Sequence, residues 1–87
     1  MKRAVRYLSS VARDFDALPT RCLREVVALI ESLVEDPAPP DSKKLVGHED
    51  YYRVPCCEYR YRLVYRIRPE KILIARVRLR SEVYAGL

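Results

Sequence analysis

The sequence contains few of the residues that usually carry recognisable chemistry. It has two glycines and no tryptophan among its 87 residues, so no glycine-rich loop that could cradle a phosphate is present. The longest unbroken aliphatic runs, Val26–Ile30 and Ile72–Ala75, fall far short of the ~20 residues that span a membrane. The N-terminus also lacks the apolar stretch of a secretory signal. These absences predict a single domain over residues 1–87, cytoplasmic and without a membrane partner.

Metal-binding and nucleophilic side chains are equally sparse. The three cysteines are an odd number with no CxxC pair, and His48 is the only histidine. A structural zinc site needs about four such ligands at suitable spacings, so we expect no metal and no cofactor. Free thiols suit a reducing compartment. A cysteine nucleophile would need His48 as its base, and a lone loop histidine is more often solvated.

Positive charge is concentrated in the second half of the sequence. The net charge is +5, yet residues 1–36 carry six basic and six acidic side chains and are therefore neutral. Residues 51–80 carry nine basic side chains against two acidic ones, a net charge of +7. Such a block is typical of a surface that binds a polyanion such as nucleic acid, although a solvated strand face has the same composition.

The first half of the chain predicts a short strand and two helices. Residues 3–8 have the composition of a strand, and the serine pair after them can cap a short helix. A second helix can begin at Pro19, because the first turn does not need proline's missing N–H. It runs to about residue 35, and prolines then start a loop over 37–49. Its apolar stripe is expected to pack on a sheet rather than form a groove for a partner helix: Leu23, Val26, Val27, Ile30, Leu33 and Val34.

From residue 51 the hydrophobic period changes to two, which indicates strands. We expect a three-strand meander of Tyr51–Val54, which Pro55 ends, followed by 59–68 and 72–80. Apolar positions of the last two strands should pack against Val26, Val27, Ile30 and Leu33: Leu63, Tyr65, Leu73, Ala75 and Val77. Basic positions should lie on the opposite face: Arg60, Arg62, Arg76 and Arg78. The predicted class is α+β, a small antiparallel sheet in the order β-α-α-β-β-β with both N-terminal helices packed on one face.

The residue types of the predicted arginine face suit phosphoryl transfer on RNA. When a ribose 2′-OH attacks its adjacent phosphate, negative charge builds on the phosphorane oxygens, and fixed guanidinium groups can stabilise it. RNA supplies its own nucleophile, so the protein has to orient the substrate, neutralise charge and move protons. Tyrosine side chains can also stack on bases.

Six short segments make the sequence similar, over nearly its whole length, to the RelE branch of the RelE/ParE toxin superfamily. Their order and spacing carry the resemblance: Leu18-Pro19, Glu35-Asp36-Pro37, Ser42-Lys43-Lys44-Leu45, Asp50-Tyr51-Tyr52-Arg53, Tyr61-Arg62-Leu63-Val64-Tyr65 and Arg80-Ser81-Glu82-Val83-Tyr84. The resemblance implies a RelE-like fold and a toxin of a type II toxin–antitoxin system that cleaves mRNA in the ribosomal A site. It also implies a cognate antitoxin, a small protein that wraps the toxin.

Carried over position by position, the resemblance assigns catalytic roles to Arg53, Arg62, Arg80 and Tyr84, with Arg78 as the rival register of Arg80. It makes Lys43 and Lys44 candidates for contact with ribosomal RNA, and the arginine face adds Arg60, Arg76 and Arg78 as RNA-binding candidates. Two departures bear on the efficiency of cleavage. Pro55 replaces a basic residue that is frequent in the family, and Arg78-Leu79 replaces a frequent Gly-His pair.

The same sequence features are compatible with other functions. A ParE-like inhibitor of DNA gyrase shares the fold and acts by binding. It would not need Arg62, Arg80 and Tyr84 together. A nucleic-acid-binding module without catalysis would use the arginine face as a simple electrostatic footprint. A degenerate toxin kept only as a binding partner is the remaining alternative.

Overall fold

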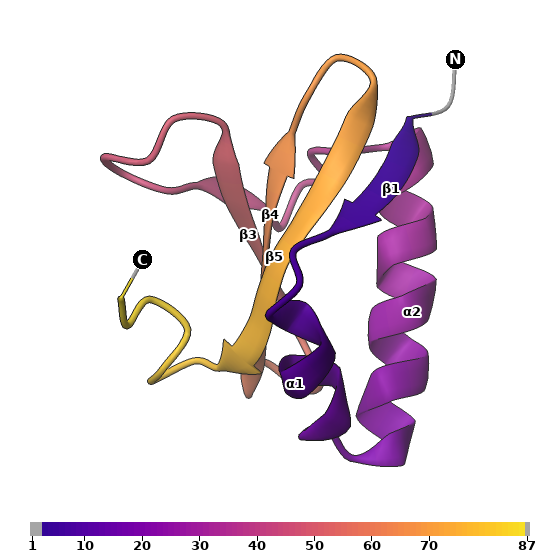
Figure 1. The fold of residues 1–87 in the computed structure, drawn as a ribbon, viewed down its shortest axis with the longest axis vertical. Coiled ribbons are helices and arrows are strands. Elements are labelled where there is room, and N and C mark those ends of the chain that lie inside the picture. The colour runs from indigo at the N-terminus through magenta and orange to yellow at the C-terminus, as the bar shows by residue number, and fades with distance from the viewer. Residues whose placement is uncertain (1–2, 87) are drawn as a thin grey trace.

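The computed structural model describes residues 3–86, which form two helices and one five-stranded sheet (Figure 1). The elements in chain order are β1 (Ala4–Tyr7), α1 (Val11–Asp16), α2 (Thr20–Glu35), β2 (Lys43–Lys44), β3 (Tyr51–Cys56), β4 (Tyr61–Ile67) and β5 (Lys71–Leu79). The predicted α+β class is confirmed. Among the described residues, neither helix has the length and hydropathy that crossing a membrane requires.

The sheet has the strand order β1-β5-β4-β3-β2. The predicted meander of β3, β4 and β5 forms its antiparallel centre. The edge strand β1 pairs in parallel with β5, which makes the sheet mixed, and the two-residue β2 pairs with β3 inside the segment expected to be loop. The strand β3 also continues past the predicted stop at Val54, so Pro55 lies within it opposite Arg62. Proline is tolerated there because β2 pairs only with Tyr52 and Arg53, which leaves that end of β3 at an edge.

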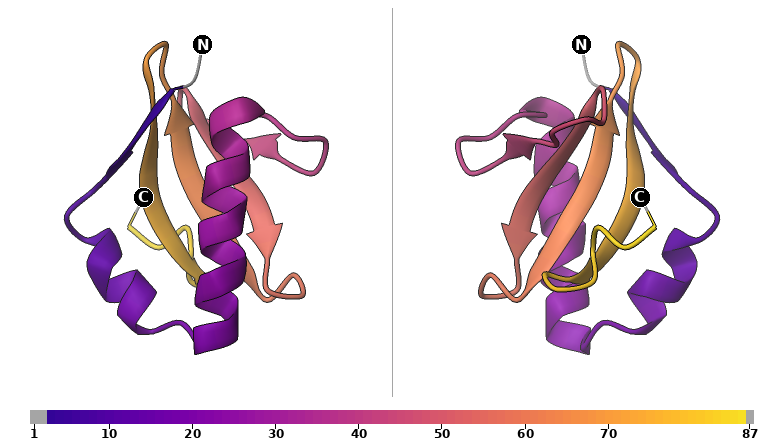
Figure 2. Two further views of the ribbon diagram at one scale, coloured as in Figure 1. Left: turned by 90° about the vertical axis from the view of Figure 1, so that its right-hand side faces the viewer. Right: turned by 90° about the vertical axis from the view of Figure 1, so that its left-hand side faces the viewer.

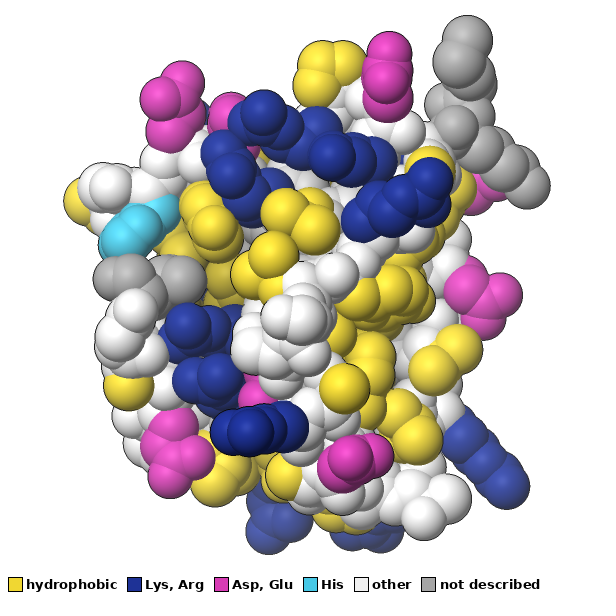
Figure 3. Space-filling view, in the orientation of Figure 1, with side chains coloured by type: hydrophobic (Ala, Val, Ile, Leu, Met, Phe, Trp, Pro, Cys, Tyr) yellow, Lys and Arg dark blue, Asp and Glu magenta, His cyan; other side chains and the backbone are white. Residues whose placement is uncertain are grey.

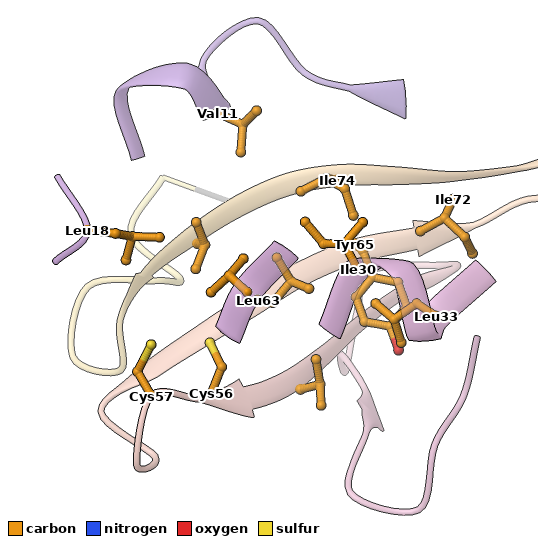
Figure 4. Packing of buried hydrophobic residues seen from close by; sticks show 13 residues of the cluster. Val11, Leu18, Ile30, Leu33, Cys56, Cys57, Leu63, Tyr65, Ile72 and Ile74 are labelled. Atoms are coloured by element: carbon orange, nitrogen blue, oxygen red, sulfur yellow. The ribbon is translucent and has the colours of Figure 1, made fainter. Parts of the chain in front are cut away.

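Both helices cover one face of the sheet, as predicted, and the main core lies between them and the strands (Figures 1 and 2). Fully buried side chains from α2 and from the three central strands meet there: Val26, Leu33, Val54, Leu63, Tyr65, Ile72 and Ile74 (Figure 4). The prediction for Val27 is wrong, because 47% of this side chain is exposed. The helix presents only a narrow stripe to the sheet, and Val27 lies beside that stripe.

A β-bulge at Ala75 changes which residues of β5 face the helices. Val64 pairs with Arg76 and Tyr65 with Ile74, so Ala75 has no partner on β4. An extra residue reverses the alternation of side chains beyond it. Ile72, Ile74 and Val77 therefore all join the helix-side core. The prediction is confirmed for Val77 and wrong for Leu73, which is only half-buried and not part of that core, and for Ala75, which is buried in a second cluster.

The face of the sheet opposite α2 is not simply an open arginine surface. Leu45, Val64, Ala75 and Val83 form a small second core there, all at most 8% exposed. Val83 belongs to the C-terminal segment that follows β5, which Figure 2 (right) shows crossing this face. The segment turns back because the N–H groups of Glu82 and Val83 both donate to the Leu79 carbonyl, at 2.9 and 3.0 Å. Burial of Val83 then fixes the positions of its neighbours.

Candidate functional site

A hollow of about 430 Å³ lies on this second face, beside the C-terminal segment. We call it the arginine hollow, and its lining residues are Lys44, Leu45, Val46, His48, Arg53, Arg62, Arg80 and Tyr84. All four residues predicted to be catalytic therefore lie around one concave surface, although they come from positions as distant as 53 and 84. Figure 3 shows basic side chains in a band near the top of this view and in a second group at the lower left, with others at the bottom and lower right, rather than in an even layer.

The sheet positions two of these arginines. Arg53 on β3 pairs with Val64, and Arg62 on β4 lies two residues before Val64, so the two arginines are diagonal neighbours on the face of the second core. The Arg62 guanidinium donates from Nη1 to the Tyr59 carbonyl at 3.3 Å. Its Nε is buried and has no hydrogen-bond partner within the described part of the chain. A buried donor without a partner is costly, which favours an acceptor from outside the protein at this position.

The turn after β5 supplies the other two predicted residues. The backbone N–H of Arg80 donates to the Arg60 carbonyl at 2.9 Å, which ties the end of β5 to the β3–β4 hairpin. Tyr84 follows the fully buried Val83 and remains 42% exposed at the mouth of the hollow. The C-terminal segment thus brings a phenol ring to the arginines that the sheet presents.

The loop around β2 closes the other side of the hollow with residues that the sequence did not predict as part of the site. Leu45 is buried in the second core, whereas Val46 is 97% exposed. The half-buried ring of His48 makes an edge contact with Tyr51, with centroids 6.1 Å apart. The sequence contained one signal for this location, because His48 lies three residues before the start of β3 and follows the two lysines of β2 closely.

Three arginines of the hollow carry positive charge that no carboxylate of residues 3–86 balances. Within residues 3–86, Arg53, Arg62 and Arg80 make no ion pair. By contrast, Asp50 contacts Arg68 at 3.3 Å and Arg66 at 4.0 Å near the other end of β4. Like charges that converge without counter-ions favour a bound anion, and the planar guanidinium group matches the oxygens of a phosphate.

The remaining RNA-binding candidates do not all reach the hollow. Lys44 lines it, whereas the exposed Lys43 lies beside it on β2, opposite Arg53. Arg60 is exposed on the β3–β4 hairpin. Arg76 is occupied by the backbone, since its Nη1 donates to the carbonyls of Val83 and Ala85 at 2.9 and 2.8 Å. Burial, and then the charge of Arg78, lowers the pKa of Arg76.

Arg78 is held by Asp14 of α1, at the edge of β5 that faces away from β4. Its Nε lies 3.1 Å from Oδ1 of the buried Asp14, whose other oxygen accepts the Val77 N–H at 3.0 Å. Arg78 therefore does not line the arginine hollow, which favours Arg80 over the rival register. The strand β1 pairs with β5 only as far as Ile74, so the Val77 N–H has no partner on β1. The Asp14 carboxylate accepts this N–H instead and so satisfies the edge of β5.

Other reactive groups lie away from the hollow. Cys22, Cys56 and Cys57 are free thiols, and burial with the nearby Glu25 charge raises the pKa of Cys56 to about 11. Burial likewise raises the pKa of Cys57. The Cys56 and Cys57 thiols therefore stay protonated at neutral pH and are poor nucleophiles. Over residues 3–86, no group of three or more His, Cys, Asp or Glu side chains is arranged to hold a metal ion.

Comparison with known proteins supports the predicted superfamily. The family model described as the ParE toxin of the type II toxin–antitoxin system, parDE, matches residues 2–84. A chain of the RelBE2 toxin–antitoxin complex from Mycobacterium tuberculosis is 29% identical, with a TM-score of 0.75 and coverage of 92% of this chain and 100% of that one. No curated protein sequence matches the chain significantly.

Two more distant structures show the same fold. A chain of the archaeal RelE–RelB complex from Pyrococcus horikoshii is 24% identical, with a TM-score of 0.77 and coverage of 95% of this chain and 100% of that one. A chain of the E. coli DinJ–YafQ toxin–antitoxin complex is 14% identical, with a TM-score of 0.81 and coverage of 97% and 99%. The family match over nearly the whole chain and the shared fold agree: this protein is a toxin of the type II toxin–antitoxin class and belongs to the ParE toxin family within the RelE/ParE superfamily.

Proposed function

We propose that this toxin is a ribonuclease that cleaves mRNA on the ribosome, with the arginine hollow as its active site. The observation that carries the proposal is the convergence of Arg53, Arg62 and Arg80, without carboxylate partners, around a hollow that Tyr84 also lines. A protein that acted only by binding would not need unpaired guanidinium groups and a phenol at one concave point. The RelE–RelB complex among the structural neighbours shows that a RelE toxin has the same fold, which supports the proposal.

In the proposed reaction the ribose 2′-oxygen attacks the adjacent phosphorus, and the bond from phosphorus to the 5′-oxygen of the next nucleotide breaks. The products are a 2′,3′-cyclic phosphate and a free 5′-hydroxyl. Arg62 and Arg80 stabilise the charge that develops on the non-bridging oxygens. The proton of the 2′-OH is removed and one is returned to the 5′-oxygen. The Tyr84 hydroxyl is our first candidate for proton transfer, and His48 is the other titratable group of the hollow outside its cationic side chains.

Single-turnover cleavage of mRNA on programmed ribosomes tests the proposal. Arg62→Ala or Arg80→Ala should lower the rate by roughly 10²–10³, the cost of losing one donor to a developing oxyanion. Lys43→Ala is the matched control, because this lysine lies beside the hollow and should affect ribosome binding and its salt dependence while the chemical step stays nearly intact. Full activity of the Arg62→Ala, Arg80→Ala double variant would exclude this active site.

Substituting His48 separates the two candidates for proton transfer. If Tyr84 moves the proton, His48→Gln should retain most of the single-turnover rate, because glutamine preserves polarity at the mouth of the hollow without an imidazole. A loss of the size expected for Arg62→Ala would transfer that role to His48.

Inhibition of DNA gyrase is the second candidate function, and the match to the ParE family model specifically favours it. A supercoiling assay with purified gyrase distinguishes the two. Loss of supercoiling at toxin concentrations that leave mRNA intact on translating ribosomes would replace the ribonuclease proposal.

We also propose a cognate antitoxin that covers the arginine hollow with an acidic and apolar segment. An uncovered cluster of unpaired arginines would bind RNA indiscriminately, and the exposed Val46 offers an apolar contact at its rim. The structural neighbours compared above are toxin–antitoxin complexes. Co-purification followed by cross-linking tests this, and contacts confined to α1 would contradict it.

A further inference from the structure

A second hollow, of about 600 Å³, adjoins the arginine hollow and shares Arg80 with it. We call it the hairpin hollow, because it lies where the β3–β4 hairpin meets the end of β5. Its lining residues are Glu58, Tyr59, Arg60, Tyr61, Leu79, Arg80 and Ser81. The Tyr59 side chain is 68% exposed, so its ring is accessible to a ligand.

The hairpin holds an uncommon backbone conformation that turns Tyr59 outward. Three consecutive residues, Cys57, Glu58 and Tyr59, have φ angles of 53°, 58° and 67°, in the left-handed region that non-glycine residues rarely adopt. The Glu25 carboxylate on α2 accepts the Cys57 N–H at 2.5 Å, and the Cys57 carbonyl accepts the Arg60 N–H at 3.1 Å. A strained turn persists when its surroundings over-determine it, as they do here.

The same hairpin is hydrogen-bonded to both arginines proposed to stabilise the scissile phosphate. The Tyr59 carbonyl accepts from Arg62 Nη1, and the Arg60 carbonyl accepts from the Arg80 N–H. Arg80 lines both hollows, and Tyr59 lines the second one. A chain of nucleotides held at Arg62 and Arg80 therefore has the hairpin hollow next to it.

We propose that the hairpin hollow binds the nucleotide of single-stranded RNA that neighbours the scissile one, a proposal that rests on the ribonuclease function above. The Tyr59 ring stacks on the base, and the Arg60 guanidinium, which makes no ion pair among the described residues, binds the phosphate. Glu58 is the one carboxylate lining this hollow, and it accepts hydrogen bonds from amino groups on the base edge. This carboxylate also disfavours an acidic antitoxin segment as the occupant.

Binding of RNA that cannot be cleaved tests the subsite independently of catalysis. The probe is a set of fluorescent oligonucleotides with 2′-O-methyl riboses in a graded series of lengths, measured by anisotropy with the isolated toxin. Tyr59→Asn removes the ring with a residue that tolerates left-handed φ, so the hairpin should fold. Tyr59→Phe retains the ring. Arg60→Gln removes the charge, and Arg21→Gln, at an exposed arginine of α2, is its control.

We expect oligonucleotides long enough to reach the hairpin hollow to bind more tightly than shorter ones, both to the unsubstituted protein and to Tyr59→Phe. For the long probes, Tyr59→Asn should bind roughly tenfold or more weakly, the effect of losing one aromatic–base stack, while the shortest probes bind equally. Three results would overturn the subsite. The first is equal binding of probes of every length by Tyr59→Asn and the unsubstituted protein. The others are a Tyr59→Asn protein that loses antitoxin binding but not RNA binding, and an unsubstituted toxin that binds none of these RNAs.

The two proposals fail separately. A toxin that binds long probes through Tyr59 yet leaves mRNA intact on ribosomes supports the subsite and refutes the ribonuclease. Cleavage that depends on Arg62 and Arg80, with probe binding indifferent to Tyr59, supports the ribonuclease and refutes the subsite.

Discussion

At the scale of single residues, Tyr84 combines a ring that can stack with a hydroxyl that can carry a proton. We expect Tyr84→Phe to lower the single-turnover rate of RNA cleavage by roughly 10² or more, the loss expected when a positioned proton-transfer group is removed while the ring stays in place. Tyr84→Ala should lose considerably more, since it removes both. Equal rates for Tyr84→Phe and the unsubstituted toxin would leave stacking as the sole role.

At the scale of elements, Arg76 holds the C-terminal segment on the sheet through the carbonyls of Val83 and Ala85. Arg76→Ala should lower the free energy of unfolding by about 1–2 kcal/mol, because two charge-assisted hydrogen bonds at a partly buried site are lost. Hydrogen exchange of residues 81–85 should accelerate and cleavage should slow, since Tyr84 is no longer fixed. Unchanged exchange of that segment would show that the burial of Val83 alone is sufficient.

The second element-scale prediction concerns Asp14, which joins α1 to β5 through Arg78 and the Val77 N–H. Asp14→Ala should cost about 2–3 kcal/mol in urea unfolding, because a buried acceptor of a backbone N–H and of a charged group disappears. Asp14→Asn should cost less, since its amide oxygen can still accept the Val77 N–H. A double-mutant cycle with Arg78→Ala isolates the ion pair, and additive losses would mean that the pair itself contributes nothing.

At the scale of the whole molecule, stability should fall under alkaline conditions. Burial raises the pKa of Cys56 from 9.0 to about 11 and that of Tyr65 from 10.0 to about 12. Between its unfolded and folded values each group keeps its proton only in the folded state. The unfolded state then binds fewer protons, so the free energy of unfolding decreases as pH rises from about 9 to 12. Below pH 9 these two groups contribute no pH dependence.

Urea midpoints at pH 7.5 and 10.5 measure this effect. Cys56→Ala provides the control, because it removes one titrating group from the core while leaving the surface charges unchanged. The variant should show a smaller decrease than the unsubstituted protein. Identical decreases would show that Cys56 contributes nothing to the alkaline loss.

The sequence by itself determined the two helices, the central strands and the basic residues of the site, but not β2 or the contribution of Leu45, Val46 and His48. Periods of 3.6 and 2 are local properties of a helix and a strand, so α2 and the meander of β3, β4 and β5 followed from the spacing of apolar residues. The block of basic residues on β3–β5 likewise indicated an anion-binding face. The resemblance to the superfamily then selected Arg53, Arg62, Arg80 and Tyr84, which the structure brings to one hollow.

Only the tertiary structure decided which face each side chain occupies and which arginines are available. The bulge at Ala75 depends on how β4 and β5 align, and no local pattern encodes that register. Arg76 and Arg78 look like Arg62 and Arg80 in the sequence, yet backbone carbonyls and Asp14 engage the first two. Their partners lie up to 64 positions away along the chain, and only folding brings such partners within hydrogen-bond distance.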